Sequence, residues 1–188
     1  MPVASVAVLC RNNGPLLSLA FKLIRQGIGV VVLGREIGKG LIVLSKKLCP
    51  EDGAPADQVR GKVLEWQESE ISTAMANDKP ERVAGITDRA ECLLAVLESA
   101  EARDAGQLRQ LLTQLFARDH GQVTLSSIHK AKGLEWDVVL HLDPWRIPSK
   151  WAKASGDERA LEQELNLKYV AETRCKHTLV AADLEYFV

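Results

Sequence analysis

Apolar positions in the first part of the chain follow two periodicities, that of a buried strand and that of an amphipathic helix. Residues 3–9 are almost wholly apolar and rich in β-branched side chains, which predicts a buried strand. Residues 16–26 carry apolar side chains at helical spacing, with Pro15 in the expected first turn and Gly27 at the expected end. The valine-rich residues 28–33 predict a second strand. A strand, a helix and a strand within about 30 residues predict a parallel sheet covered by helices.

The middle of the chain has a different pattern. Between residues 41 and 119 apolar residues recur at helical spacing, and charges and prolines separate them. We interpret these positions as helix faces that pack on one another, because no functional motif stands among them. The strand pattern returns at residues 123–128 and 138–142. A charged helix is then predicted over residues 157–174, followed by a closing strand at residues 177–182.

Together these elements predict an α/β fold in which a mostly helical insertion interrupts a parallel sheet flanked by helices. We expect residues 1–40 to form the first part of the sheet domain, residues 41–119 the insertion, and residues 120–188 the second part. The sequence has no apolar run near the roughly 20 residues that span a bilayer. Its first residues also lack a secretory signal pattern, so we expect a cytoplasmic protein without membrane contact.

Composition limits the possible binding partners. The 188 residues are 46% hydrophobic and 26% charged, as in an ordinary soluble domain with one core. The formal net charge is −1, whereas an independent nucleic-acid-binding domain is usually strongly basic. Any nucleic-acid contact must therefore be local or shared with another domain. The four cysteines and four histidines are scattered without the spacing of metal ligands, so we expect no metal site.

Residues 34–40 superficially resemble a phosphate-binding loop. That loop needs four residues between its first glycine and the Gly-Lys pair, followed by Ser or Thr to hold Mg²⁺. Here three residues separate Gly34 from Gly38, and Gly40 follows Lys39. We therefore interpret the segment as a Gly-rich turn between a strand and a helix.

Residues 123–139 carry the most informative pattern. A predicted strand ends in hydroxyl side chains, and the chain then passes His129 and two lysines, turns at Gly133 and presents Glu135 before the next strand. Open α/β sheets bind ligands at strand ends. Hydroxyls and basic side chains contact phosphates there, and a carboxylate can accept from a sugar hydroxyl. Taken singly, each of these residues also suits an ordinary surface loop.

The ordered series hydroxyl-x-His-x-x-Lys-Gly-Leu-Glu closely resembles motif V of UvrD-like superfamily 1 DNA helicases. Ser127 stands where that family usually has threonine, which keeps the hydroxyl. The resemblance implies that Ser127 and His129 face single-stranded DNA, and we expect the basic Lys132 to join them. It also implies that Gly133 and Glu135 meet the ribose of ATP.

Residues 164–176 resemble motif VI of the same family, whose core is Tyr-Val-Ala-x-Thr-Arg-small-Lys. The resemblance makes Arg174 the catalytic finger that reaches the γ-phosphate of ATP. The fixed charge and planar donors of arginine match the charge that spreads over the phosphoryl group during transfer. An arginine at a helix end, taken alone, would equally suit a surface ion pair.

Residues 6–13 resemble motif IV more loosely, as a strand followed by Arg, a polar residue and Asn. By this resemblance Arg11 is a second catalytic contact to the γ-phosphate. A hydrophobic strand that ends in arginine is common, so this assignment depends on the two motifs downstream.

The resemblance implies the second RecA-like domain of an ATP-dependent DNA helicase or translocase. Its cofactors would be ATP and Mg²⁺, with the phosphate loop and the magnesium ligands on a missing N-terminal RecA-like ATPase domain. That domain would belong to the same longer chain or to a separate protein. We therefore expect the isolated chain to be inactive as an ATP hydrolase. The alternative is a non-catalytic, helicase-derived module that binds DNA or a partner protein.

Residues 145–153 interleave tryptophans with basic side chains. Surfaces that bind single strands combine these two residue types. A loop that packs its tryptophans on the core explains the pattern equally well.

Overall fold

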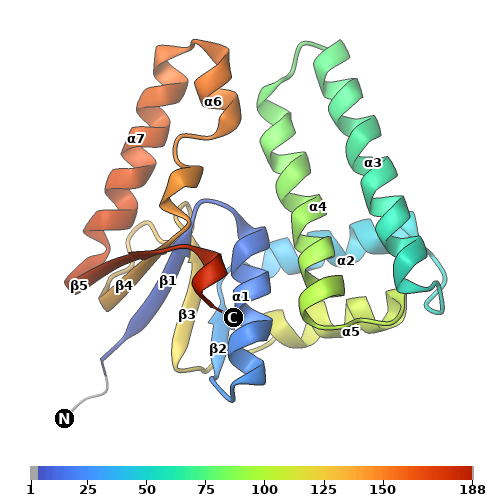
Figure 1. Cartoon of the computed structure of the whole chain (residues 1–188), viewed down its shortest axis with the longest axis horizontal. Helices are drawn as coiled ribbons and strands as arrows, with labels where there is room; N and C mark the ends of the chain where they lie inside the picture. Colours follow the sequence, from blue (N-terminus) through green and yellow to red (C-terminus); the bar gives the residue numbers. More distant parts are fainter. Residues whose placement is uncertain (1–3, 188) are drawn as a thin grey trace.

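The computed structural model describes residues 4–187, and its centre is one parallel sheet with helices on both faces (Figure 1). The sheet has five strands in the order β2-β3-β1-β4-β5, and each neighbouring pair is parallel. The strands are β1 (Val6–Cys10), β2 (Val30–Val32), β3 (Val123–Ser127), β4 (Trp136–Leu142) and β5 (Cys175–Ala182). The expected α/β class with a parallel sheet flanked by helices is confirmed.

Helices form most of the remaining chain. They are α1 (Asn13–Arg25), α2 (Arg35–Leu48), α3 (Ala56–Ala76), α4 (Glu81–Ser99), α5 (Ala105–Phe116), α6 (Lys150–Ser155) and α7 (Glu158–Thr173), with 3-10 turns η1 (Pro144–Arg146) and η2 (Leu184–Tyr186). Each strand and helix predicted from periodicity is present, with bounds that shift by a few residues. The predicted first strand included Val3, which lies outside the described residues. None of the helices in residues 4–187 is both long and apolar enough to cross a lipid bilayer.

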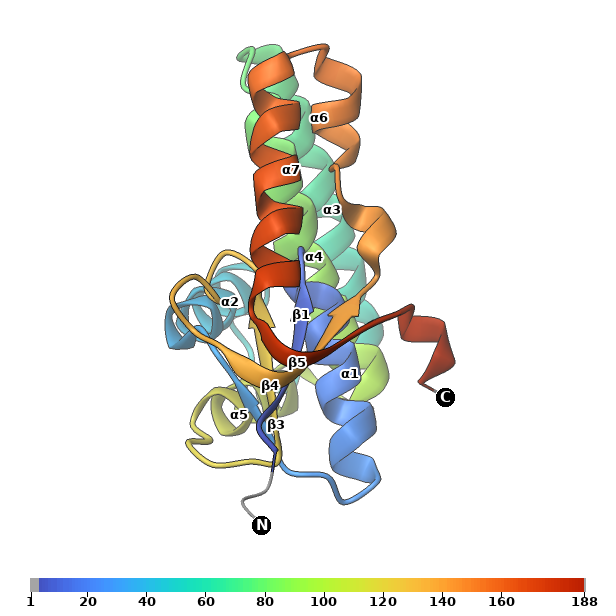
Figure 2. The same ribbon diagram turned by 90° about the vertical axis from the view of Figure 1, so that its left-hand side faces the viewer.

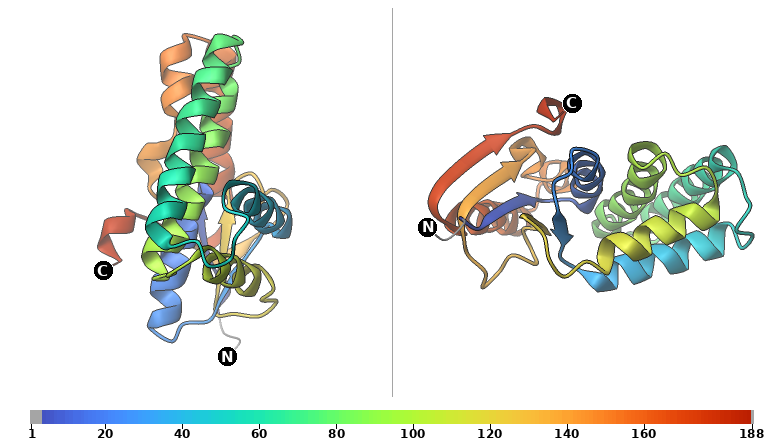
Figure 3. Two further views of the ribbon diagram at one scale, coloured as in Figure 1. Left: turned by 90° about the vertical axis from the view of Figure 1, so that its right-hand side faces the viewer. Right: turned by 90° about the horizontal axis from the view of Figure 1, so that it is seen from below.

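The larger core lies on the face of the sheet that α1 covers. Helix α1 packs against α4, and strand residues such as Val8 and Leu125 are buried beneath them. The helices α2 to α5 contribute their apolar faces to the same core, with α2 and α5 side by side (Figure 3). The helical segment therefore packs as part of the main body. The division at residues 40 and 119 stays a prediction, and α2 runs through residue 40.

A smaller core lies on the opposite face, under α7 and the segment that connects β3 to β4. Leu167 and Ala171 of α7 pack there with Ile128 and Ala131 of the connecting segment. Helix α7 ends where β5 begins, and its first half extends beyond the sheet (Figure 2). At the edge, β5 is largely exposed along its length.

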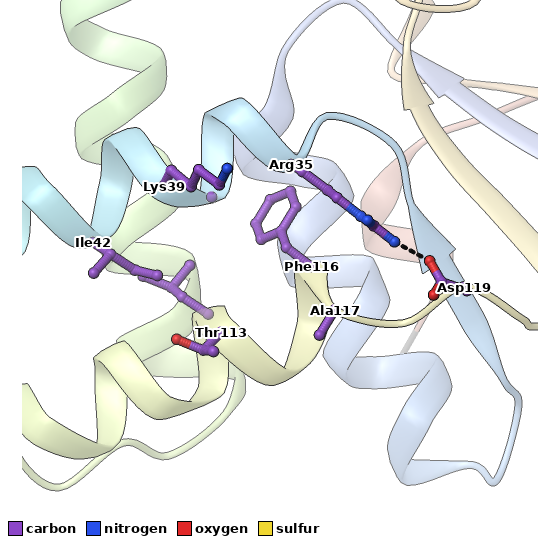
Figure 4. Close-up of a pocket in the computed structure, with 9 residues that line it drawn as sticks. Arg35, Lys39, Ile42, Thr113, Phe116, Ala117 and Asp119 are labelled. Atoms are coloured by element: carbon purple, nitrogen blue, oxygen red, sulfur yellow. Dashed lines mark hydrogen bonds and ion pairs between the residues drawn. The ribbon is translucent and has the colours of Figure 1, made fainter.

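The predicted Gly-rich turn is confirmed only at Gly34, which has a φ of +111° just before α2. The rest of the interpretation was wrong, because Gly38 and Gly40 lie within the helix. A Cβ atom on Gly38 would lie 2.6 Å from the ring of Phe116 on α5. Gly38 thus permits the close approach of the two helices, and Figure 4 shows Phe116 between them beside Arg35.

Two glycines of α2 should respond in opposite directions to replacement by alanine. Gly38→Ala places a methyl group against Phe116 and should lower the free energy of unfolding by about 1–3 kcal/mol through overpacking. Gly40 has open space around its Cβ position. Gly40→Ala should therefore raise the free energy of unfolding by about 0.5–1 kcal/mol, because alanine favours the helix. Urea unfolding of the two variants tests this, and equal effects would contradict the packing assigned to Gly38.

Candidate functional site

The residues singled out from the motifs lie at two opposite edges of the sheet. Arg11 and Ser127 stand at the carboxyl ends of β1 and β3, whereas Glu135 and Arg174 come immediately before β4 and β5. Because all the strands are parallel, the first pair lies at the carboxyl edge and the second at the amino edge. The residues compared with motif V are therefore divided between the two edges of the sheet.

Residues 128–135 connect the two edges by crossing one face of the sheet. The segment begins with a turn in which the backbone N–H groups of Lys130 and Ala131 donate to the carbonyl of Ser127, at 3.0 and 3.1 Å. Ile128 and Ala131 are fully buried beneath α7, which fixes the segment against the sheet. Gly133, with a φ of +83°, then redirects the chain into β4.

At the amino edge, Arg174 contacts the segment that carries Glu135. Its Nη1 donates to the carbonyl of Leu134 at 3.4 Å, and its Nη2 donates to the hydroxyl of Thr173 at 3.1 Å. The backbone N–H of Trp136 donates to the carbonyl of Arg174 at 3.0 Å. Glu135 is exposed and Arg174 is partly exposed. The structure thus brings together the two motif segments from which a nucleotide contact was predicted.

At the carboxyl edge, Arg11 forms a bidentate ion pair with Glu164 of α7. The Nε and Nη2 atoms of Arg11 donate to the two carboxylate oxygens at 2.8 and 2.5 Å. The backbone N–H of Ser149 donates to the same carboxylate at 3.0 Å. The two charged side chains are only 14% and 10% exposed. Burial alone would raise the pKa of Glu164, but the hydrogen bonds and charge of Arg11, with Ser149, outweigh it and lower the pKa.

Arg11 contacts the middle of α7, whereas Arg174 follows the last residue of that helix. Glu164, the partner of Arg11, precedes Arg174 by ten residues. That separation corresponds to about 15 Å of helix. The structure therefore brings Arg174 to the Gly133–Glu135 turn and Arg11 to Glu164, and it does not bring the two arginines together. A γ-phosphate contact by Arg11 stays a prediction.

The residues expected to face nucleic acid differ in their accessibility. His129 and Lys132 are exposed, whereas Ser127 is only 5% exposed. Partial loss of hydration lowers the pKa of His129, and the positive charge of Arg11 lowers it further. The imidazole is therefore neutral at neutral pH and can both donate and accept hydrogen bonds. Nucleic-acid contacts by these three residues stay predictions.

Sequence reasoning missed Glu164 as a partner of Arg11. Glu164 belongs to the segment compared with motif VI, but its spacing from Arg174 indicates no role. Arg11 and Glu164 are 153 residues apart in sequence, so only the fold reveals their contact. One sequence feature could have indicated this partner: Glu164 is a charged residue on the face of α7 that becomes buried, and it is only 8% exposed.

Comparison with known proteins identifies related sequences. Residues 63–185 match the sequence profile of the UvrD-like helicase C-terminal domain. The chain is 30% identical to the ATP-dependent DNA helicase UvrD2 of Mycobacterium bovis, over 93% of this chain and 27% of the relative. It is 31% identical to F-box DNA helicase protein 1 of Schizosaccharomyces pombe, over 63% of this chain and 13% of the relative.

A third relative is the probable DNA helicase II homolog of Rickettsia conorii, which is 32% identical over 59% of this chain and 18% of its own length. The chain thus spans about a quarter or less of the length of these relatives. The profile match at residues 63–185 includes strands β3, β4 and β5. The match to UvrD2 also covers most of the remaining chain.

Proposed function

Because this chain belongs to the UvrD-like helicase C-terminal domain family, we propose that it forms the C-terminal portion of an ATP-dependent DNA helicase or translocase. In this proposal Arg174 contacts the γ-phosphate of ATP, and Gly133 and Glu135 contact the ribose. A separate RecA-like domain carries the phosphate loop and the magnesium ligands. The observation that carries the proposal is the contact of Arg174 with Leu134, next to Glu135, at the amino edge of the sheet.

The hydrogen bonds of Arg174 leave it available for a phosphate. Its acceptors are two backbone carbonyls and a hydroxyl, all neutral, and no carboxylate within residues 4–187 lies within 4 Å of it. Hydrogen bonds between charged groups are about twice as strong as neutral ones. Exchange of these neutral acceptors for phosphate oxygens would therefore be favourable. ATP would supply the phosphoryl group and Mg²⁺ would neutralise charge on its phosphate oxygens, and both would be bound mainly by the other domain.

Arg11 is the second proposed phosphate contact, and it is less available than Arg174. Its guanidinium already meets a carboxylate through two hydrogen bonds, so contact with ATP requires release of Glu164. Such a release leaves Glu164 with only the N–H of Ser149. We therefore rank Arg11 behind Arg174 in its contribution to hydrolysis.

The proposed DNA contacts begin at the opposite edge of the sheet with Ser127 and His129, and Lys132 lies further along the crossing segment, next to Gly133. His129 and Lys132 are exposed and would meet a single strand directly, whereas Ser127 is buried. Residues 128–135 join these groups to the nucleotide contacts, so closure around ATP could move the DNA contacts. The net charge of −1 supports a DNA path shared with another domain.

A reconstitution experiment tests the proposal. The chain is joined to the phosphate-loop domain of a UvrD-like helicase, and Mg²⁺-dependent ATP hydrolysis is measured with and without single-stranded DNA. The joined protein should hydrolyse ATP with DNA stimulation, and the 188-residue chain alone should not. Hydrolysis by the chain alone would contradict the proposal that a separate domain carries the phosphate loop. A joined protein that binds DNA without hydrolysis would favour the non-catalytic module.

A further inference from the structure

A groove lies between α4 and residues 144–153, beyond the carboxyl edge of the sheet. Its cavity measures about 360 Å³. Val83, Ala84 and Thr87 form the α4 wall, residues 145–153 form the other wall, and Arg11 lies at the inner end. Helices α4 and α6 stand side by side above the sheet (Figures 1 and 2). The groove therefore joins the helical segment of the middle of the chain to the edge that carries the proposed DNA contacts.

The charges that line the groove are mainly positive. The basic residues are Arg11, Arg146, Lys150 and Lys153, and the acidic one is Glu91. The two arginines are held by carboxylates, whereas Lys150 and Lys153 are exposed and have no carboxylate within 4 Å in the part of the chain that the structure describes. Two available cations therefore mark a basic site on a chain of net charge −1.

An exposed aromatic ring lies beside these cations. Trp145 is 56% exposed, so the alternative that it packs on the core does not hold for this residue. The guanidinium of Arg146 lies 4.7 Å from the centroid of the indole ring. Arg146 is fixed in turn by Asp143, which accepts from its Nε at 2.9 Å and is buried. The ring is thus held in place with much of its surface open to solvent.

We propose that this groove binds single-stranded nucleic acid, with phosphates at Lys150 and Lys153 and a base stacked on Trp145. Proteins that bind single strands combine a basic groove with aromatic rings for stacking. The volume lies at the lower end of the roughly 300–1,000 Å³ of small-ligand sites, which suits one nucleotide unit of a strand. The inference rests on the proposed function, because the strand would continue from His129 into the groove. It gives α4 the role of the opposite wall.

The charge arm of the test uses the full 188-residue chain and a fluorescently labelled oligothymidylate, with Kd measured by anisotropy at several salt concentrations. The double variant Lys150→Gln/Lys153→Gln should lower the slope of log Kd against log salt by about 1.4, or 0.7 for each lost phosphate contact. The matched control is Lys46→Gln/Lys47→Gln, which removes two exposed lysines at the end of α2. The control should keep the unmodified slope.

The stacking arm of the test measures the contribution of the Trp145 ring to binding while the neighbouring lysines stay in place. Trp145→Ala should weaken binding about 5- to 150-fold, the range for loss of one stacked base, whereas Trp145→Phe should retain most of the affinity. Thr87→Glu adds a carboxylate to the α4 wall and should weaken binding. Ser72→Glu adds one to an exposed position of α3 outside the groove and should not. Circular dichroism and Tm of each variant verify that the chain remains folded.

The outcomes distinguish this inference from the proposed function. If the groove variants bind as tightly as the unmodified chain while His129→Ala binds more weakly, the groove proposal is overturned and the proposed DNA contact of His129 is retained. If the unmodified chain binds no oligonucleotide, both are overturned. Equal binding of polyglutamate and oligothymidylate would reveal a general polyanion surface and overturn the assignment to nucleic acid.

Discussion

Replacement of Arg174 by alanine should lower kcat for ATP hydrolysis by about three to five orders of magnitude in the chain joined to a phosphate-loop domain. The reason is that a guanidinium stabilises charge on the phosphoryl oxygens that develops only in the transition state. KM for ATP should change far less, because other groups hold the nucleotide. Steady-state hydrolysis with saturating single-stranded DNA measures both quantities.

Two further variants make this prediction specific. Arg174→Lys keeps the charge but loses the planar set of donors, so it should recover only a small part of the rate. Arg159→Ala removes an exposed arginine from the first turn of the same helix and should leave kcat unchanged. A rate for Arg174→Ala equal to that of the unmodified protein would remove Arg174 from the proposed nucleotide site.

Replacement of Glu164 by alanine should lower the free energy of unfolding by about 3–5 kcal/mol, the usual cost of removing one partner from a buried ion pair. The change leaves the guanidinium of Arg11 and the N–H of Ser149 without their common acceptor. Both charged side chains are at least 86% covered, so solvent cannot replace the carboxylate fully. Urea unfolding at neutral pH measures the loss. The double variant Arg11→Leu/Glu164→Leu should recover much of it.

Acid should reveal the same ion pair. The pKa of Glu164 is lowered from 4.5 in the folded chain, so its contribution to stability is fully present above pH 4.5. The contribution is lost as the pH falls through the lower folded pKa. The difference in unfolding free energy between the unmodified chain and Glu164→Ala should therefore shrink in that window. A difference that stays constant down to low pH would show that packing, rather than charge, explains the loss.

Local patterns were sufficient to predict the elements of the fold. Strands such as β1 are short apolar runs that need no distant information, and α7 has a helical pattern bounded by Asp157, which caps its first turn. The proximity of Arg174 to the Glu135 segment was also expected, since both belong to motifs that serve one nucleotide in the family. The strands and helices are specified by neighbouring residues, whereas the proximity of Arg174 to Glu135 was implied by the family resemblance.

The features that sequence alone missed depend on contacts between distant residues. Gly38 is a helix-packing glycine only because Phe116 of α5 lies over it. The partner of Arg11 is set by the position of α7 across the sheet. Trp145 had two open interpretations, and its exposure excludes only the one in which it packs on the core. None of these contacts produces a periodic pattern in the sequence.

The connection from β3 to β4 is short. Ser127 lies level with Cys10, and Trp136 lies two residues before Val138, which is level with Val6, so the two ends differ by about 20 Å along the strands. Two strand spacings add about 10 Å sideways. Nine Cα–Cα steps reach at most about 30 Å when fully extended, and the turn at the start uses part of that length. The turns of this connection at residues 127–131 and 131–134 could open, so the physical link between its Glu135 end and its His129 end is the burial of Ile128 and Ala131 beneath α7.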